Sequence, residues 1–328
     1  MTSKPKVAFY WCASCGGCEE TVVDLNEDIL KVVAAVDIVL WPVALDFKRR
    51  DIEALSDGEI AVSFINGAVR LSEQEEWVKL LRQKSQLIVA FGSCAHLGGI
   101  PSLGNTANRE LIFQRKYMTV PTADNSAKTF PCVSTLVDGH ELDLPSFYDT
   151  VKTLDQTIDV DYYLPGCPPP TSLVGEAVRA ILEGKLPERG AVLAPNKSQC
   201  DTCPLNETKP EKLAIREFKR VATSAPDPKT CFLAQGYICL GPATRSGCGE
   251  RCIRGNMPCR GCFGPMDGVL DQGAKALSAI ASIIDSNDPE EINRIINTIE
   301  DPLGTFYRFS LAGSLLRGSR VVETKRGG

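Results

Sequence analysis

The hydrophobic and polar positions of the first 190 residues alternate between two patterns. Short apolar runs predict β-strands, and between them lie segments whose apolar residues recur at the spacing of an α-helix. The predicted strands cover residues 6–11, 37–43, 59–66, 86–92 and 160–164. The predicted helices cover residues 19–36, 72–84, 108–118 and 171–185, and Ser72 with Glu75 forms a capping box for the second. Strands that alternate with helices indicate an α/β fold with a doubly wound parallel sheet.

The pattern changes beyond about residue 190. The stretch from Pro195 to Gly268 is rich in Gly, Pro and Cys and has few long apolar runs. Helices are predicted over 210–220, 269–285 and 289–299. We therefore predict two domains, residues 1–190 and 191–328. The second is expected to bury little apolar core of its own and to be held together by bound metal.

Composition and charge narrow the class of protein. The 328 residues carry a formal net charge of -5, which argues against nucleic acid as a partner. No apolar run approaches the ~18 residues that a membrane-spanning helix needs, and the N-terminal segment has no signal-peptide pattern. We expect a cytoplasmic protein with no membrane partner. The basic residues near the C-terminus predict a docking tail: Arg317, Arg320, Lys325 and Arg326.

The cysteines indicate the chemistry. The chain has 14 cysteines and only two histidines. In a reducing compartment, clustered thiols favour metal or cluster ligation over disulfides. Eight cysteines fall between Cys200 and Cys262, which is two complete sets of the four thiolates that a 4Fe-4S cluster needs. This pattern predicts electron transfer through iron-sulfur clusters.

Four further cysteines lie in loops that follow predicted strands: Cys15 and Cys18 around a Gly-Gly pair, Cys94, and Cys167. In open α/β sheets, ligands bind outside the carboxyl ends of the strands, so these thiols should meet in one crevice. Alternatively, Cys94 and Cys167 are buried small residues, although their places beside strand ends weaken that interpretation. Cys12 precedes Cys15 by three residues and could replace it as a ligand.

The eight later cysteines divide into two sets by spacing. One set is Cys200, Cys203, Cys231 and Cys239, and the other is Cys248, Cys252, Cys259 and Cys262. A single Cys-x-x-Cys is equally compatible with half a zinc site or a redox dithiol. Two sets in tandem, beside the first tetrad, favour iron-sulfur clusters. A zinc-stabilised scaffold remains the alternative for residues 200–262.

Other polar residues near the first tetrad have two interpretations each. His96 could donate a hydrogen bond to a cluster sulfur, or it is a structural histidine. Glu19 and Glu20 could carry protons, or they simply favour the N-terminus of a helix. Cys132 follows Pro131 in a loop and receives no role, and Asp138-Gly139 predicts a hairpin turn.

Five segments of the chain resemble the small, electron-transfer subunit of nickel-iron hydrogenases. The segments are Cys15–Glu20 (CGGCEE), Gly92–Pro101 (GSCAHLGGIP), Pro165–Pro169 (PGCPP), Gly236–Arg245 (GYICLGPATR) and Met257–Pro265 (MPCRGCFGP). Within that family the chain is most similar to the cytoplasmic group whose members reduce methyl viologen but not deazaflavin. Enzymes of this group associate with heterodisulfide reductase.

The resemblance implies a flavodoxin-like N-terminal domain and three 4Fe-4S clusters. It implies a proximal cluster on Cys15, Cys18, Cys94 and Cys167. It implies a medial cluster on Cys248, Cys252, Cys259 and Cys262, and a distal cluster on Cys200, Cys203, Cys231 and Cys239. Two positions depart from the periplasmic enzymes, because Cys200 replaces a histidine ligand and Cys252 replaces the proline found beside a 3Fe-4S medial cluster.

The resemblance also implies partners. A large subunit would hold the nickel-iron centre, since its paired Cys-x-x-Cys motifs are absent here. The electrons would pass to an iron-sulfur or flavin subunit, which we expect to belong to a heterodisulfide reductase complex. Alternatives are a deazaflavin- or NAD(P)-reducing hydrogenase and a subunit of a quinone-linked complex I. The eight later cysteines argue against the complex I branch, which keeps only the proximal site.

Overall fold

A computed structural model of the chain describes residues 4–317. Its centre is a five-stranded sheet in the order β2-β1-β3-β5-β9, and every neighbouring pair is parallel. The strands are β1 (Lys6–Trp11), β2 (Asp37–Leu40), β3 (Ile60–Asn66), β5 (Ser85–Phe91) and β9 (Tyr162–Leu164). Counted among the parallel strands alone, this order is 2-1-3-4-5, that of flavodoxin. The predicted α/β, doubly wound fold is confirmed.

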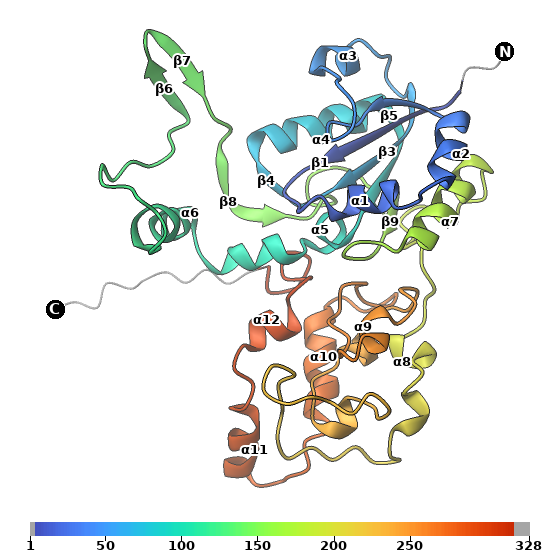
Figure 1. Ribbon diagram of the computed structural model, residues 1–328, viewed down its shortest axis with the longest axis vertical. Helices are drawn as coiled ribbons and strands as arrows, with labels where there is room; N and C mark the ends of the chain where they lie inside the picture. Colours follow the sequence, from blue (N-terminus) through green and yellow to red (C-terminus); the bar gives the residue numbers. More distant parts are fainter. Residues whose placement is uncertain (1–3, 318–328) are drawn as a thin grey trace.

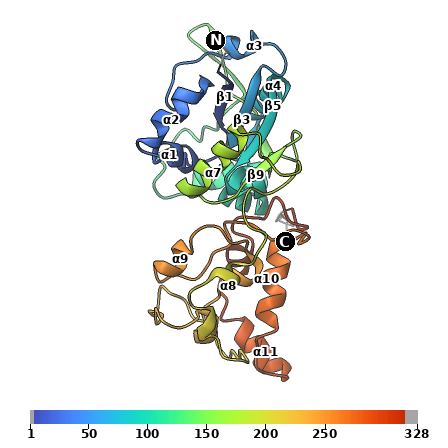
Figure 2. The ribbon, with the colours of Figure 1, turned by 90° about the vertical axis from the view of Figure 1, so that its right-hand side faces the viewer.

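Helices cover both faces of the sheet (Figures 1 and 2). They are α1 (Gly17–Val23), α2 (Asp28–Ala35) and α7 (Thr171–Leu182) on one face, and α3 (Arg49–Glu53) and α4 (Ser72–Lys84) on the other. Alternate residues of each strand face opposite ways, so Phe64 packs under Val22 of α1 and Val174 of α7, whereas Ile88 packs under Leu81 of α4. Two separate apolar cores therefore stabilise the sheet.

The predicted helix over residues 19–36 is two helices. Asn26 interrupts it with a φ of 52°, a left-handed conformation that asparagine tolerates better than most residues. The Asn26 side chain donates to the Asp24 carbonyl oxygen over 3.0 Å and stabilises the break. The apolar residues keep their helical spacing through this turn, so the sequence pattern does not reveal the break.

The proposed capping box at Ser72 is also wrong. The amide of Leu71 donates instead to the side-chain oxygen of Gln74, over 3.0 Å. The Ser72 hydroxyl accepts from the amide of Ser146 and so ties this helix to a strand that the pattern missed. That strand, β8 (Phe147–Lys152), pairs antiparallel with β4 (Val69–Leu71).

An arm leaves the sheet between β5 and β9. It follows α5 (Ser93–Leu97) and η1 (Ile100–Thr106), and it contains α6 (Arg109–Gln114), the π-helix η2 (Arg115–Thr119), and the strands β6 (Ser134–Val137) and β7 (His140–Asp143). Figure 1 shows the β6-β7 hairpin standing away from the body. The hairpin turn predicted at Asp138-Gly139 and the helix predicted from residue 108 are both confirmed.

The residues from about 195 onwards form most of the lower part of Figure 1, with short helices and long loops. The α-helices are α8 (Gln199–Thr202), α9 (Arg251–Arg254), α10 (Gln272–Ala281), α11 (Pro289–Ile296) and α12 (Pro302–Phe306). Three short 3-10 helices accompany them: η3 (Asn206–Thr208), η4 (Leu233–Gln235) and η5 (Gly241–Ala243). The helices predicted over 269–285 and 289–299 correspond to α10 and α11, which are shorter at one or both ends.

The helix predicted over 210–220 does not form. The segment is extended instead, and its Ile215 and Lys219 form bridges with Ile284 and Tyr237. Ile215 and Phe218 are buried in an apolar cluster that also contains Phe232 and Leu311. The expectation that this part of the chain buries little core was therefore wrong, because distant segments supply the cluster jointly.

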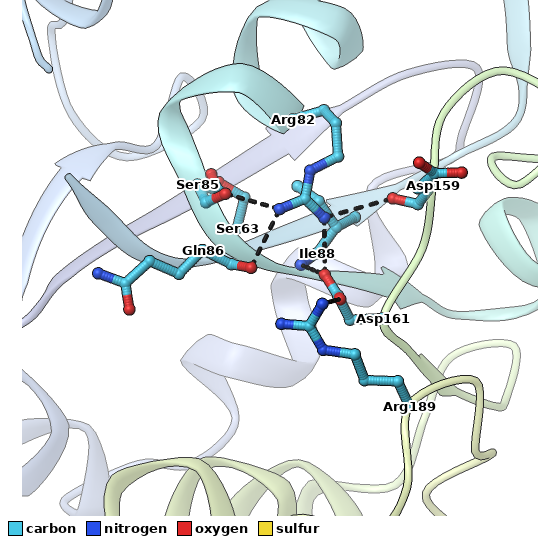
Figure 3. A network of polar contacts seen from close by, with 8 residues as sticks. All are labelled: Ser63, Arg82, Ser85, Gln86, Ile88, Asp159, Asp161 and Arg189. Carbon is cyan, nitrogen blue, oxygen red and sulfur yellow. Dashed lines mark hydrogen bonds and ion pairs between the residues drawn. The ribbon is translucent and has the colours of Figure 1, made fainter. Parts of the chain in front are cut away.

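The sheet's amino-terminal edge carries a polar network (Figure 3). Arg82 donates to Asp161 over 2.6 Å and to the carbonyl oxygens of Ser85 and Gln86. Asp161 also accepts from the Ile88 amide over 2.7 Å and pairs with Arg189. These contacts join α4, β5 and the start of β9 at the edge opposite the cysteine-bearing loops.

The boundary placed at residue 190 stays a prediction. Residues 191–193 run beside β9, where the Leu193 amide donates to the Tyr163 carbonyl oxygen over 2.8 Å. Within residues 4–317, no helix is long and apolar enough to cross a membrane. Of the predicted basic tail, Arg320, Lys325 and Arg326 lie outside the described residues.

Candidate iron-sulfur sites

The parallel strands bring the first predicted tetrad to one edge of the sheet. Cys15 follows β1, Cys18 lies in the first turn of α1, Cys94 lies in α5 directly after β5, and Cys167 follows β9. The Ser93 amide donates to the Gly166 carbonyl oxygen over 2.7 Å, which joins the loops of Cys94 and Cys167. The thiolates of Cys94, Cys167 and Cys15 each add to the elevation of the Cys18 pKa. We call this group the proximal site.

Two glycines make room for these sulfurs. A Cβ atom built on Gly92 would lie 2.4 Å from the Cys18 sulfur, and one built on Gly99 would lie 2.4 Å from the Cys94 sulfur. Both glycines also have positive φ values, 86° and 56°, which residues with a side chain rarely adopt. The glycines of the GSCAHLGG segment therefore shape the walls of the proximal site.

The four proximal cysteines differ in burial, and burial raises the pKa of the most buried thiols. Cys18 is buried, whereas Cys15 and Cys167 are exposed, so one side of the site faces outward. Burial, more than the neighbouring thiolates, raises the pKa of Cys94 to about 12 and raises that of Cys18 as well. These thiols stay protonated near neutral pH unless a metal displaces the proton.

A second cavity is lined by all four cysteines of the predicted medial set. They are Cys248, Cys252, Cys259 and Cys262, and Cys252 is carried by the short helix α9. Burial raises the pKa of both Cys259 and Cys262 to about 12. The medial site is therefore deeper than the proximal site except at Cys252, which is exposed.

A third cavity is lined by all four cysteines of the predicted distal set, Cys200, Cys203, Cys231 and Cys239. Helix α8 carries Cys200, and burial raises the pKa of this thiol to about 11. A Cβ atom on Gly241 would lie 3.2 Å from the Cys200 sulfur, so a small residue is needed here too. Lys209 lines the same cavity and favours the Cys200 thiolate.

The three sites adjoin one another in a definite order. The Cys262 carbonyl oxygen of the medial set accepts a hydrogen bond from the hydroxyl of Ser93, the residue before Cys94 of the proximal set. On the opposite side, the Cys259 amide donates to the Cys239 sulfur of the distal site over 3.3 Å. The medial site therefore adjoins both of the other two.

The two remaining cysteines lie elsewhere. Cys12 is buried in the apolar core beneath α4, and burial alone raises the pKa of its thiol. Cys132 is exposed on the arm, where it borders a recess of about 740 Å³ with Phe113, Phe130 and Phe147. The structure thus groups Cys15, and not Cys12, with the proximal thiols.

Gln199 is a site residue that the sequence did not reveal. Its side chain is buried and lines both the medial and the distal cavity. The amide oxygen accepts from the Cys248 thiol over 3.1 Å, and the amide nitrogen donates to Glu250 over 3.2 Å. A lone glutamine before Cys200 has no pattern that distinguishes it from a solvent-facing residue.

Two polar residues near the proximal site are buried. The pKa of His96 falls to about 3 because the ring is buried and Arg245 is near, so the imidazole is neutral. Its Nδ1 atom has no hydrogen-bond partner among the described residues. The imidazole ring packs against the ring of Tyr163, with 4.6 Å between the ring centroids. Glu19 accepts from Asn66 over 3.2 Å, and burial raises the pKa of its carboxyl group.

Within residues 4–317, no three Cys, His, Asp or Glu side chains converge closely enough to hold a single metal ion. A cubane cluster bonds each of its four thiolates to a different iron atom, so its ligands stand further apart than those of one ion. The three cysteine sets have the ligand number and ligand type that a 4Fe-4S cluster requires.

Comparison with known proteins identifies the family. The family model described as "NADH ubiquinone oxidoreductase, 20 Kd subunit" matches residues 15–181, just over half of the chain. The iron-sulfur subunit of the F420-non-reducing hydrogenase of Archaeoglobus profundus is 39% identical over 95% of this chain and 97% of its own length. The chain belongs to the small-subunit family of nickel-iron hydrogenases, in the F420-non-reducing branch.

Further relatives of the small subunit agree. A subunit of the F420-non-reducing hydrogenase of Methanothermobacter thermautotrophicus is 36% identical over 96% of this chain and 97% of its own. A subunit of the F420-non-reducing hydrogenase of Methanocaldococcus jannaschii is 35% identical over 96% of this chain and 98% of its own. The small subunit is therefore similar to these relatives over both the sheet and the cysteine-rich part.

The fold is shared with a solved structure. The recombinant [NiFeSe] hydrogenase from Desulfovibrio vulgaris Hildenborough superposes with a TM-score of 0.52, over 87% of the small subunit and 99% of that chain. The sequences are only 16% identical, so this likeness concerns the fold alone. The resemblance predicted from the sequence motifs is confirmed at the level of the family.

Proposed function

We propose that this small subunit holds three all-cysteine 4Fe-4S clusters and conducts electrons between a nickel-iron large subunit and an acceptor subunit. The observation that supports this most is the arrangement of twelve cysteines in three adjoining sets of four. A bound cluster supplies reversible one-electron transfer. The residues of this chain hold, orient and enclose that group.

The proximal cysteines would serve the large subunit. Cys15 and Cys167 are exposed at the sheet edge, and two large apolar residues in the same segments, Trp11 and Ile100, are also exposed. Electrons released when dihydrogen is oxidised on the large subunit would enter here. An obligate interface of this kind commonly buries more than ~2,000 Å².

The order of the sites supports a path for the electrons. Electrons that enter at the proximal site would pass to the medial site, which the Ser93–Cys262 contact places beside it, and then to the distal site, which the Cys259–Cys239 contact places next. Hydrogen bonds to a ligating sulfur are among the features that set a cluster's potential. The exit is then the distal site, where Cys203 and Cys231 are partly exposed.

The acceptor that we propose is an iron-sulfur or flavin subunit of a heterodisulfide reductase complex. The resemblance to the methyl-viologen-reducing group supports this choice, and so do the names of relatives that are described as F420-non-reducing. We also propose a cytoplasmic location. A deazaflavin- or NAD(P)-reducing enzyme is the alternative, and a complex that purifies with such an acceptor subunit would replace our choice.

The first experiment measures iron, acid-labile sulfide and zinc per chain in complex purified without oxygen. Three 4Fe-4S clusters predict about twelve iron and twelve sulfide. About four of each would leave the proximal cluster alone. Zinc in place of the missing iron would instead favour the zinc-stabilised scaffold for residues 200–262.

Cys252→Pro tests the medial assignment. Loss of this exposed ligand should convert the medial cluster towards a three-iron form, which is visible by electron paramagnetic resonance (EPR). Cys132→Ser is the control, because Cys132 is also exposed but lies on the arm. An unchanged spectrum in Cys252→Pro would remove Cys252 from the ligand set.

Dihydrogen-dependent reduction of heterodisulfide by the co-purified complex tests the acceptor.

A further inference from the structure

One arginine lines the medial cavity and lies near thiols of both later cysteine sets. Arg260 lies in the loop between Cys259 and Cys262, and its side chain helps to line the medial cavity. Its guanidinium group also interacts electrostatically with the thiolates of Cys252, in the medial set, and Cys239, in the distal set. Its position therefore places one positive charge near both sites.

The charge of Arg260 is not neutralised by a carboxylate. Among residues 4–317, Arg260 forms no ion pair, whereas Arg216 pairs with Asp285 and Arg220 with Glu300. On its other side, Arg260 lines a recess of about 170 Å³ together with Arg308, Lys219 and the carboxylates Glu300 and Asp301. Glu300 pairs with Arg220, and Asp301 accepts from the Gly304 amide, so these two carboxylates have other partners.

We propose that Arg260 is a positioning residue that raises the reduction potentials of the medial and distal clusters. This inference rests on the proposed function. A cluster gains a negative charge when it is reduced, and a nearby cation stabilises the reduced form. Arg260 is only partly exposed, so solvent screens this interaction less than it would at the surface. Arg260 thereby draws electrons from the proximal site into the second half of the relay.

Redox titration of the purified complex, followed by EPR, tests the proposal. Arg260→Gln should lower the medial potential so that the ratio of reduced to oxidised cluster falls about tenfold at the wild-type midpoint, which is 59 mV for one electron. The distal potential should fall by less, because Arg260 lines the medial cavity and not the distal one. Arg260→Lys keeps the charge and should restore most of the shift.

Arg216→Gln is the matched control. It removes an arginine that is 72% exposed and paired with Asp285, outside the two cysteine-lined cavities, and it should leave both potentials unchanged. Arg308→Gln removes a second positive charge from the recess without altering a ligand-bearing loop. It should shift the medial potential in the same direction by a smaller amount, and it provides a test even if Arg260→Gln does not assemble.

Three outcomes would overturn the inference. In the first, the potentials in Arg260→Gln match those in Arg216→Gln. In the second, the potentials in Arg260→Lys fall as far as those in Arg260→Gln, which would assign the effect to the shape of the side chain rather than to its charge. Arg308→Gln could also leave the medial potential unchanged. Failure of the proposed function would be recognised by a different observation, because the wild-type complex itself would then lack the medial and distal cluster signals.

Discussion

The sheet and the cysteine-rich part place their proposed ligands differently relative to their apolar cores. In the sheet, Cys15, Cys94 and Cys167 lie in segments that follow strands, and of the proximal set only Cys18 belongs to a buried apolar core. In the cysteine-rich part, Cys239 and Cys259 are themselves members of a buried cluster, and Cys203 and Cys231 pack against it. Cys248 and Cys262 pack instead against the core of the sheet. In our proposal, the sheet would hold its cluster mainly at its rim, and the cysteine-rich part would pack around its clusters.

This difference indicates how far the stability of each region depends on bound metal. Two helix-covered faces bury enough apolar surface to stabilise the sheet without a cluster. In the cysteine-rich part, an empty site leaves buried thiols around a cavity, so the contacts that cluster atoms would make are lost. The first region should therefore tolerate metal loss better than the second.

Complete removal of iron should have the largest effect. After treatment of the full chain with a chelator and an oxidant, amides of α10 and of residues 232–240 should lose their protection from hydrogen exchange. Amides of β3 and β5 should keep theirs, because both strands are central in the sheet. Hydrogen-exchange mass spectrometry provides the measurement. Equal loss of protection in both regions would contradict the comparison.

Removal of one proximal ligand should remove one cluster and no more. In Cys18→Ser, iron and sulfide should each fall by about four per chain, with the distal and medial EPR signals preserved. Cys12→Ala is the matched control, because Cys12 is a buried cysteine six residues earlier that packs only in the core. If Cys12→Ala lost the iron instead, the proximal ligand set would need to be redrawn.

Truncation of a core side chain in the sheet should cost stability but not iron. Leu81 of α4 is fully buried, so Leu81→Ala should lower the free energy of unfolding by about 2–5 kcal/mol. Urea unfolding of metal-free chain would show this as a lower midpoint. Leu182→Ala, at a side chain that is 45% exposed, should change the midpoint little. A loss of iron from Leu81→Ala would show that the core and the rim are coupled.

The polar network at the far edge of the sheet should matter least. Arg82→Gln removes the donor to Asp161 and two carbonyl oxygens (Figure 3) and should cost about 1–3 kcal/mol. Arg50→Gln, at an arginine that is 83% exposed, is the control. Iron content should be normal in both. An Arg82→Gln chain as stable as wild type would mean that this network contributes little.

Local signals in the sequence were sufficient for most of the sheet. Each parallel strand was predicted near its true position because short apolar runs between helices have few other interpretations. The failures have physical causes. Asn26 broke a helix without breaking its apolar spacing, and the segment around Ile215 followed a helical pattern but is held extended by Ile284 and Tyr237. Long-range pairing outweighed local preference there.

The sequence by itself determined the number of thiols, their grouping by spacing, and the edge of the sheet where the first four meet, because parallel strands bring their carboxyl ends together. Only the tertiary structure decided which thiol of Cys12 and Cys15 joins that group, and that the medial set adjoins both of the others. It alone placed Gln199 beside both later cavities and Arg260 beside the medial one. The reason is that these contacts join residues far apart in the chain, and no local pattern records which distant side chain a residue will meet.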